Sequence, residues 1–514
     1  MTKSAKPSTL LDLLEIGAPN HPAIQVPDGP TITYDALRHQ VYALADNVMA
    51  LGIRRTDRVA IVLPNSAETI ISFLGVAAVA IAAPLNPAYK SEEFRFYLED
   101  TSALALMTGS QGGEIAQNAA SDTTLPIGVD VDAQGHVTIS TPGNGDGARL
   151  EETASPNHVA LILHTSGTTS RPKRVPLTHG NLAASVANIV ETYNLTADDV
   201  SLCIMPLFHV HGLVASTLAT LASGGTVVVP TRFNALNLWR TVQDYGVTWF
   251  TGVPTMHQAL LSRARGTQFP GPEATPYSGL RFIRSCSAAL PAATMLEMEE
   301  RFGVPVLEAY GMTEASHQMS SNPLPPGNRL PSSVGKGTGV SIAIMDESGA
   351  LQPPGIRGEV VIQGPNVIRG YEDNPEANST SFTDGWFRTG DEGVVDSEGY
   401  LTLSGRLKEI INRSGEKISP QEIDEVLLSH PAVAEAVAFG VMSTTHGEEP
   451  SAAVVLRRPV TQAELIRYCR NHLADFKCPR VIHIVSEIPR TATGKIQRRI
   501  VAEATAEKIS GAPP

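Results

Sequence analysis

Short apolar runs alternate with longer stretches of helical spacing along most of this 514-residue chain. The runs DRVAIVLPN (57–65), GGTVVVP (224–230), VTWFTGVP (247–254) and LRFIRSCSA (280–288) are rich in β-branched and aromatic residues, whereas YDALRHQVYALADNVMALG (34–52) has the apolar period of a helix. Strands that alternate with helices pair in parallel, because a crossover helix returns the chain to the same edge of the sheet. The predicted fold class is therefore α/β, with parallel-rich sheets and helices in a large N-terminal domain.

Two stretches depart from this alternation and predict the domain organisation. The segment 337–365 contains short strands with turn signals, which indicates a β-rich subdomain at about 330–404. Further on, Ser419-Pro420-Gln421-Glu422 has the pattern of a capping box with proline at the first helical position. We predict an N-terminal domain of residues 1–407 and a small C-terminal α+β domain of residues 408–514.

The charge of the chain restricts the class of partner. The formal net charge is −13, which argues against nucleic acid because phosphate backbones select basic surfaces. Residues 409–514 carry 13 Lys or Arg and 13 Asp or Glu, so the acidic excess lies on the rest of the chain. This difference in charge between the two regions indicates that the C-terminal region is a separate domain.

The cysteines and the ends of the sequence favour a cytoplasmic protein. Cys203, Cys286, Cys469 and Cys478 form no C-x-x-C pair, which favours buried thiols in a reducing compartment over disulfides or a zinc site. The start, MTKSAKPSTLLDLL, has no secretory apolar region, and the end, ISGAPP, has no peroxisomal signal. The most apolar run (73–85) is too short to cross a bilayer, so no membrane partner is expected.

A stretch rich in hydroxyl groups, HTSGTTSRPKRVPLTH (164–179), follows the apolar run LIL. It is not a Walker loop, because Gly167 is the only glycine before Lys173. Backbone N–H groups and Ser or Thr hydroxyls can still hold phosphate oxygens, and a nearby lysine can offset their charge. A solvated Ser/Thr turn is the alternative. This stretch alone does not distinguish a phosphate-binding loop from such a turn.

Six further motifs follow in a fixed order. They are PLFHVHG (206–212), SCSAALP (285–291), EAYGMTEAS (308–316), GWFRTGDEG (385–393), GRLKEIINRSGEKI (405–418) and RTATGKIQRR (490–499). Together with the hydroxyl-rich stretch, they resemble the core motifs of the adenylate-forming superfamily, which includes acyl-CoA synthetases, over the whole chain after residue 30. The strings HTSGTTSRPK, RFIRSCSA, MSSNPLP and GEKISP resemble the oxalyl-CoA synthetase group of plants and fungi, and F-H-x-H-G is similar to malonyl-CoA synthetases.

The resemblance implies a two-step reaction with ATP, Mg²⁺ and CoA, in which an acyl-adenylate forms and a thiol then displaces AMP. Fixed positive charge and N–H donors should dominate catalysis of such steps. The implied ATP-binding residues are Thr165, Ser166, Gly167, Thr168, Thr169, Ser170, Lys173, Ala288, Ala289, Glu308, Ala309, Tyr310, Gly311, Asp391 and Arg406. Ser170 and Arg174 replace glycines of the family. Arg174 is therefore either strained at positive φ or an added phosphate contact, and the sequence leaves both open.

The same resemblance assigns the catalytic groups. Glu314 is implied as the magnesium ligand and Thr313 as an α-phosphate contact. Lys495 is implied as the adenylation lysine, carried by a lid that turns about a hinge at Lys408. That rotation would bring Gly415 and Lys417 to the site for CoA.

The predicted acyl pocket is polar. His209, His211, Ser287 and His317 are expected to bind the acid, and His209 is also expected to be catalytic. Thr251, Ser285, Ser316 and Gln318 line the same region. Histidine and hydroxyl donors suit a short acid with a second charged end, because burying a charge without partners is prohibitive. Malonate activators carry an arginine where this chain has Leu296, which favours oxalate.

Three alternatives stay open at this stage. The acid can be malonate or another short hydroxy or keto acid. The adenylate can pass to a carrier protein or amine instead of CoA, although no carrier-like motif and no obligate protein partner is inferred. The chain can also be a catalytically weak nucleotide-binding protein that keeps the fold.

Overall fold

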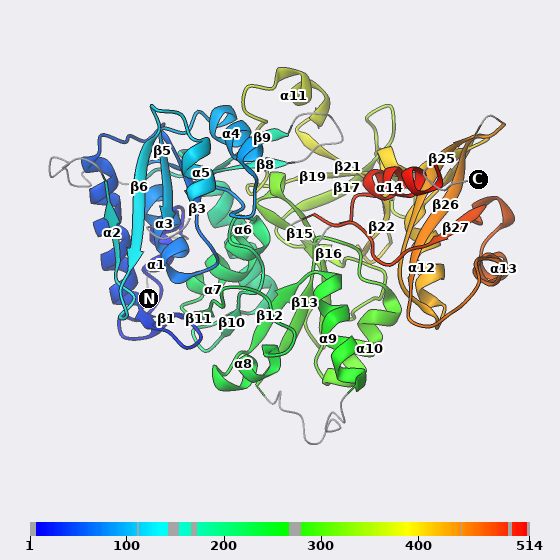
Figure 1. The fold of residues 1–514 in the computed structure, drawn as a ribbon, viewed down its shortest axis with the longest axis horizontal. Coiled ribbons are helices and arrows are strands. Elements are labelled where there is room, and N and C mark those ends of the chain that lie inside the picture. Colours follow the sequence, from blue (N-terminus) through cyan, green and yellow to red (C-terminus); the bar gives the residue numbers. More distant parts are fainter. Residues whose placement is uncertain are drawn as a thin grey trace.

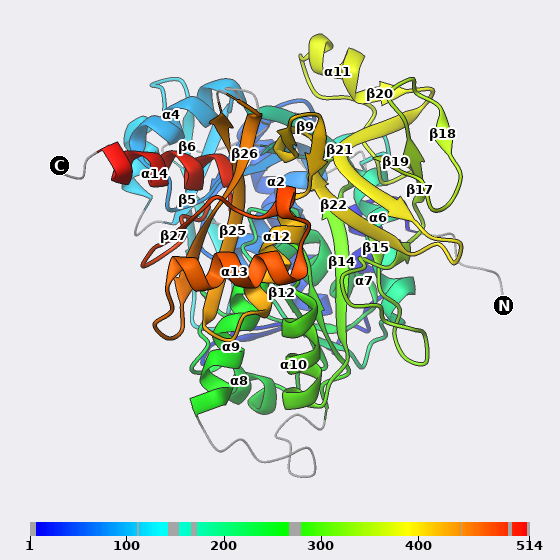
Figure 2. The ribbon, with the colours of Figure 1, turned by 90° about the vertical axis from the view of Figure 1, so that its right-hand side faces the viewer.

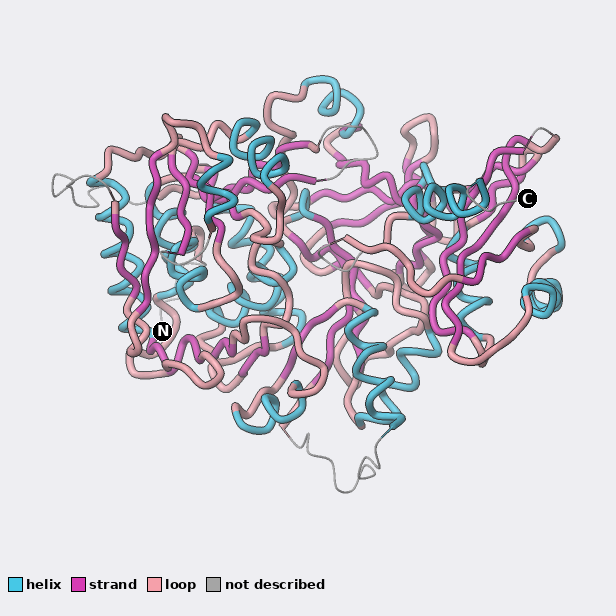
Figure 3. Tube along the Cα trace, viewed as in Figure 1, coloured by secondary structure: helices cyan, strands magenta, loops and turns pink. Residues whose placement is uncertain are grey.

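Two mixed sheets with helices form the N-terminal part, as Figure 1 shows at the left and centre. The computed structural model describes residues 7–109, 113–141, 154–165, 172–266, 279–443, 445–491 and 496–510. Figure 3 shows strands side by side with helices through this part, which confirms the predicted α/β class.

The nine-stranded sheet has the order β16-β15-β14-β13-β12-β10-β11-β1-β2. Its neighbours from β1 to β14 pair in parallel, and β2, β15 and β16 pair antiparallel at the two ends. The strands are β1 (Pro22–Gln25), β2 (Thr31–Thr33), β10 (Val200–Leu202), β11 (Thr226–Val228), β12 (Trp249–Gly252), β13 (Phe282–Ser285), β14 (Val306–Met312), β15 (His317–Ser321) and β16 (Lys336–Gly337). The carboxyl ends of parallel strands meet at one edge, so the residues that follow β12, β13 and β14 are brought together.

The seven-stranded sheet has the order β7-β6-β5-β3-β4-β8-β9. Its strands are β3 (Arg58–Val62), β4 (Ile81–Pro84), β5 (Ala105–Gly109), β6 (Leu125–Val131), β7 (Val137–Ser140), β8 (Val159–Thr165) and β9 (Lys173–Thr178). The antiparallel pair β8–β9 flanks the hydroxyl-rich stretch, with Thr165 opposite Lys173 and His164 opposite Arg174.

Two smaller sheets complete the fold. The predicted β-rich subdomain is an antiparallel sheet of β17 (Ser341–Met345), β18 (Leu351–Gln352), β19 (Arg357–Gln363), β20 (Phe382–Thr383), β21 (Trp386–Val395) and β22 (Leu401–Arg406). The C-terminal sheet has β23 (Ile411–Arg413), β24 (Glu416–Ile418), β25 (Val433–Ser443), β26 (Gly447–Leu456) and β27 (Val481–Ile484). Figure 2 shows its strands behind α13 and α14. The boundary after residue 407 stays a prediction.

Helices join these sheets. They are α1 (Leu10–Leu14), α2 (Tyr34–Ala50), α3 (Ala67–Val79), α4 (Ser91–Asp100), α5 (Glu114–Ala119), α6 (His179–Tyr193), α7 (Ala219–Ala222), α8 (Leu238–Asp244), α9 (Pro254–Gly266), α10 (Ala292–Phe302), α11 (Pro375–Ser381), α12 (Pro420–Ser429), α13 (Gln462–His472) and α14 (Arg498–Ser510). The other helical segments are the π-helix η1 (His211–Leu218) and the 3-10 helices η3 (Thr313–Ala315), η4 (Leu407–Glu409) and η5 (Asp475–Lys477).

The most apolar run of the sequence is interior structure. It forms most of α3 and the strand β4, and every residue of α3 except Glu68 is buried. A helix that is apolar on all sides belongs inside a core. None of the described helices combines the length and hydropathy that a bilayer crossing needs.

Two further sequence predictions can be compared with the structure. Ser419 caps α12, because its hydroxyl accepts from the Glu422 N–H, whereas the Glu422 carboxylate binds Lys477 at 2.7 Å. The first half of the capping box is therefore present, and the Glu422 side chain serves another contact. All four cysteines are buried free thiols, as predicted.

Candidate active site

Two of the sequence motifs, PLFHVHG and SCSAALP, meet at His211. The imidazole Nδ1 of His211 lies 3.0 Å from Ser287 Oγ, and its Nε2 lies 2.6 Å from Thr251 Oγ1. The ring of His317 stacks on that of His211, with centroids 5.0 Å apart. Predicted pocket residues from β12, the β13–α10 connection, η1 and β15 thus form one polar cluster, which we call the histidine cluster.

The PLFHVHG motif folds into a tight turn that starts η1. The His209 imidazole accepts the backbone N–H of His211 at 3.2 Å, so it fixes the start of the π-helix. A Cβ at Gly212 would lie 2.4 Å from the carbonyl oxygen of Pro206, so only glycine fits there. π-Helices are rare and concentrate at functional sites.

The backbone around the cluster is strained. Ser287, Ser316 and His317 have φ values of 73°, 52° and 110°, which non-glycine residues seldom adopt. A Cβ on Gly311 would lie 1.9 Å from the His317 carbonyl oxygen, so the family glycine at this position is required by packing. Strain of this kind collects where a structure holds side chains for function.

The phosphate region lies at the open end of the β8–β9 pair. Thr165 Oγ1 donates to Glu314 Oε1 at 3.4 Å, and the Lys173 ammonium lies 4.4 Å from the centre of the Tyr371 ring. Burial lowers the pKa of Lys173, Glu314 opposes this, and Lys408 lowers it further. The predicted hinge residue thus lies close enough to act on the phosphate-loop lysine. Ser166, Gly167, Thr168, Thr169 and Ser170 lie outside the described residues.

Glu314 is a buried carboxylate on η3, next to the predicted Thr313. It is 6% exposed, and the Tyr371 hydroxyl donates to its Oε1 at 2.8 Å. Within the described part of the chain it forms no ion pair, so a bound cation would compensate its charge. No group of three His, Cys, Asp or Glu able to hold a metal occurs among those residues. A single buried carboxylate fits magnesium, which is commonly held by one or two carboxylates and the phosphates of a nucleotide.

The predicted ribose site is also assembled. Asp391 on β21 lies opposite Arg406 on β22, and Arg406 Nε lies 2.8 Å from its Oδ1. The Tyr310 hydroxyl donates to the other carboxylate oxygen. Burial raises the pKa of Asp391, and Arg406 opposes that shift. Among the predicted adenine contacts, Ala288 and Ala289 are exposed, whereas Ala309 is buried.

The structure describes some of the residues predicted to act from the C-terminal domain. Lys417 on β24 pairs with Glu347 of the β-rich subdomain at 3.3 Å, and Gly415 has a positive φ of 91° in the turn before it. Lys417 therefore contacts the β-rich subdomain in this arrangement. Lys495 lies outside the described residues.

Comparison with known proteins identifies the family. The model of the AMP-binding enzyme matches residues 17–372, and that of the AMP-binding enzyme C-terminal domain matches residues 422–495. The chain belongs to the AMP-binding enzyme family. The sequence prediction of an adenylate-forming enzyme is confirmed.

Relatives of this AMP-binding enzyme match it over nearly its whole length. It is 47% identical to an oxalate–CoA ligase of Arabidopsis thaliana, covering 97% of this chain and 99% of the relative. It is 44% identical to an oxalate–CoA ligase of Saccharomyces cerevisiae, covering 94% and 95%. The crystal structure of ATP-bound MatB from Rhodopseudomonas palustris is 30% identical, with a TM-score of 0.86 over 98% of this chain and 99% of that one.

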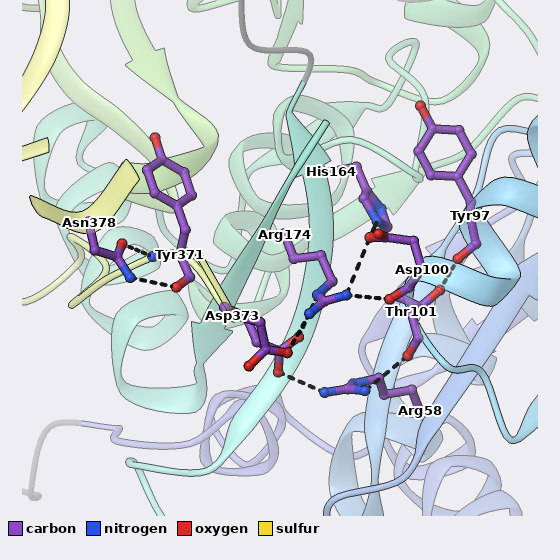
Figure 4. A network of polar contacts seen from close by, with 10 residues as sticks. Arg58, Tyr97, Asp100, Thr101, His164, Arg174, Tyr371, Asp373 and Asn378 are labelled. Atoms are coloured by element: carbon purple, nitrogen blue, oxygen red, sulfur yellow. Dashed lines mark hydrogen bonds and ion pairs between the residues drawn. The ribbon is translucent and has the colours of Figure 1, made fainter. Parts of the chain in front are cut away.

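For Arg174, the structure excludes strain at positive φ, whereas the phosphate contact stays a prediction. The φ of Arg174 is not positive, and the Arg174 side chain points toward acidic groups (Figure 4). Arg174 Nε lies 2.9 Å from Glu372, and the guanidinium also contacts Asp100 and Asp373. His164 Nε2 lies 3.0 Å from Asp100. Arg174 therefore ties the β8–β9 pair to α4 and to the loop that carries Tyr371, and we call this group the Arg174 cluster.

Sequence reasoning missed Arg284 and Tyr371. Arg284 sits inside the LRFIRSCSA strand and is fully buried against the histidine cluster. The signal was available, since a charged residue within an apolar strand needs an interior partner. Leu296, at the place of the arginine of malonate activators, is 54% exposed on α10.

Glu308 provides a pH-dependent prediction. Burial raises its pKa to about 8 from 4.5, although the Leu290 N–H lowers it. Between these two values the unfolded chain releases a proton that the folded chain keeps, so stability falls as pH rises through this window. Glu308→Gln cannot ionise, so its stability relative to wild type should improve from pH 5 to pH 8.

The measurement is the apparent melting temperature of both proteins across that range. Glu300→Gln, at an exposed position of α10, is the matched control and should show no such trend. An unchanged difference between Glu308→Gln and wild type at both pH values would contradict the assignment.

Proposed function

We propose that this enzyme is an oxalate–CoA ligase that uses ATP, Mg²⁺ and CoA. The observation that carries the proposal is the histidine cluster, where His211, Ser287 and Thr251 form a continuous polar chain. A short dianion needs such donors once it is out of water. The oxalate–CoA ligases at 44–47% identity support the same acid.

In the first step, one carboxylate oxygen of oxalate attacks the α-phosphorus of ATP, and the bond to pyrophosphate breaks. Lys173 and the hydroxyls of the phosphate loop hold the phosphates, and Asp391 holds the ribose hydroxyls together with Arg406. Magnesium, when bound at Glu314, offsets phosphate charge as a Lewis acid. Lys495 would reach the carboxylate and α-phosphate from the C-terminal domain, and Thr313 would contact the α-phosphate.

In the second step, the thiolate of CoA attacks the acyl carbon, and AMP leaves. The thiol proton is released, so oxalyl-CoA and AMP are the products. We propose that the domain of residues 408–514 turns about Lys408 between the steps and brings Gly415 and Lys417 to the acceptor side. The pair between Lys417 and Glu347 would break in that rotation, because their elements belong to the two moving parts.

The test is ATP-dependent release of pyrophosphate with oxalate, malonate, glycolate, acetate, coumarate and octanoate, each with and without CoA. Oxalate should give the highest kcat/KM, and sustained turnover should require CoA. His211→Ala and His317→Ala should then lose activity with oxalate. Highest activity with octanoate or coumarate would contradict the polar pocket, and highest activity with malonate would replace oxalate by the longer diacid.

A further inference from the structure

Arg284 on β13 is a fully buried cation beside the histidine cluster. Its Nε donates to the Tyr193 hydroxyl at 2.8 Å, Nη2 to Gln318 Oε1 at 3.0 Å and Nη1 to Thr251 Oγ1 at 3.0 Å. All three acceptors are uncharged. Across the described ranges no carboxylate pairs with Arg284, and a guanidinium keeps its charge when buried. An interior charge without a counter-ion is costly, which favours an anion bound within reach of its field.

The bonds around Arg284 favour one arrangement of hydrogens. A guanidinium can only donate, so Thr251 Oγ1 accepts from it and has its own hydrogen left for His211 Nε2, 2.6 Å away. Arg284 Nη1 also lies 3.4 Å from that nitrogen, and a guanidinium, which can only donate, favours an Nε2 that carries no hydrogen.

With Nε2 as the acceptor, neutral His211 carries its proton on Nδ1. That N–H points at Ser287 Oγ, 3.0 Å away, which accepts it. Among the residues that the structure describes, the hydroxyl hydrogen of Ser287 then has no acceptor. We call this series of hydrogen bonds, Arg284–Thr251–His211–Ser287, the relay. It begins at a buried cation and ends at a hydrogen that can be donated to an anion.

We propose that Arg284 is the positioning residue for the second carboxylate of oxalate, acting through Thr251, His211 and Ser287 without touching the acid. Each bond in such a chain polarises the next, so the cation strengthens donation by Ser287. The selectivity for a dianion then depends on Arg284, which is separated from Ser287 by Thr251 and His211. This inference rests on the proposed function, because it takes the histidine cluster as the oxalate site.

The first test compares Arg284→Met with Arg284→Lys in the full-length enzyme. Arg284→Met should raise the KM for oxalate about tenfold, the scale of one lost hydrogen bond, and change the KM for ATP little. The KM for glycolate, which lacks a second carboxylate, should rise less. Arg284→Lys keeps the charge and should fall between Arg284→Met and wild type. An equal rise of all three KM values, or an unchanged KM for oxalate, would overturn the relay.

A second pair keeps the inference testable if Arg284→Met does not fold. Thr251→Val preserves shape but breaks the relay, whereas Thr251→Ser keeps the hydroxyl and should bind oxalate more tightly than Thr251→Val. Where both single variants fold, adding Thr251→Val to Arg284→Met should raise the KM for oxalate no further, because both changes break one chain. Additive effects would overturn the proposal.

The wild-type enzyme separates the two proposals. If it prefers an acid without a second carboxylate, the proposed function and the relay both fail. If it prefers oxalate and the Arg284 and Thr251 variants keep its KM, only the relay is wrong.

Discussion

Glu314→Gln is expected to lower kcat for pyrophosphate release on the order of 10²–10³-fold, the usual cost of removing one preorganised electrostatic contact at a transition state. The Gln amide keeps the size of the side chain and removes the negative charge. In the folded enzyme that charge is buried, 6% exposed, and receives a hydrogen bond from the Tyr371 hydroxyl. Burial and the neighbouring Glu314 raise the pKa of Tyr371, so its hydroxyl stays a donor.

The measurement is pyrophosphate release as a function of Mg²⁺ concentration at saturating ATP. Glu314→Gln should need more Mg²⁺ in addition to losing kcat, because a carboxylate ligand has been replaced by an amide. Tyr371→Phe is the matched comparison, since it removes one hydrogen bond to Glu314 and leaves the charge. It should lose less activity than Glu314→Gln. A Glu314→Gln enzyme with wild-type kcat and wild-type Mg²⁺ dependence would show that Glu314 has no part in metal binding.

Arg174→Gly, which restores the residue usual in the family, should lower the free energy of unfolding by about 3 kcal/mol. It leaves Asp100 and Glu372 without their shared guanidinium, and Asp100 is 9% exposed. This value is the lower end of the roughly 3–5 kcal/mol that breaking a buried ion pair costs. We expect the lower end because His164 still contacts Asp100 and Arg58 still pairs with Glu372 at 2.7 Å.

The measurement is denaturant unfolding of Arg174→Gly and of Arg174→Lys beside wild type. Lysine keeps the charge but lacks the planar fork of five N–H donors that arginine offers, so Arg174→Lys should lie between the other two. The alternative role, a direct phosphate contact, predicts another result. In that case Arg174→Gly would keep its stability and raise the KM for ATP.

The order of strands and helices was predictable because it depends on local periodicity. The apolar runs at 57–65, 224–230, 247–254 and 280–288 became β3, β11, β12 and β13, and the stretch at 34–52 became α2. The β-rich subdomain was also recognised from short strands and turn signals. These patterns need only neighbours in the chain, so one sequence contains them in full.

The candidate site was predictable where a motif carries its own chemistry. Glu314, Asp391, Arg406 and His211 come from those motifs, and Arg406 lies 2.8 Å from Asp391, whereas the roles of all four toward ATP, magnesium and the acid stay predictions. Residues 166–170 of the phosphate loop and Lys495 stay predictions, since they lie outside the described residues.

By itself, the sequence determined the α/β architecture, the family and the residue types at the site, because period and motif order are properties of the chain. Only the tertiary structure decided what Arg174 and Arg284 do. Arg284 meets Tyr193, Thr251 and Gln318 at separations of 91, 33 and 34 residues. The effect of a charge depends on which groups surround it and how far water is excluded, and both are set when distant segments pack together.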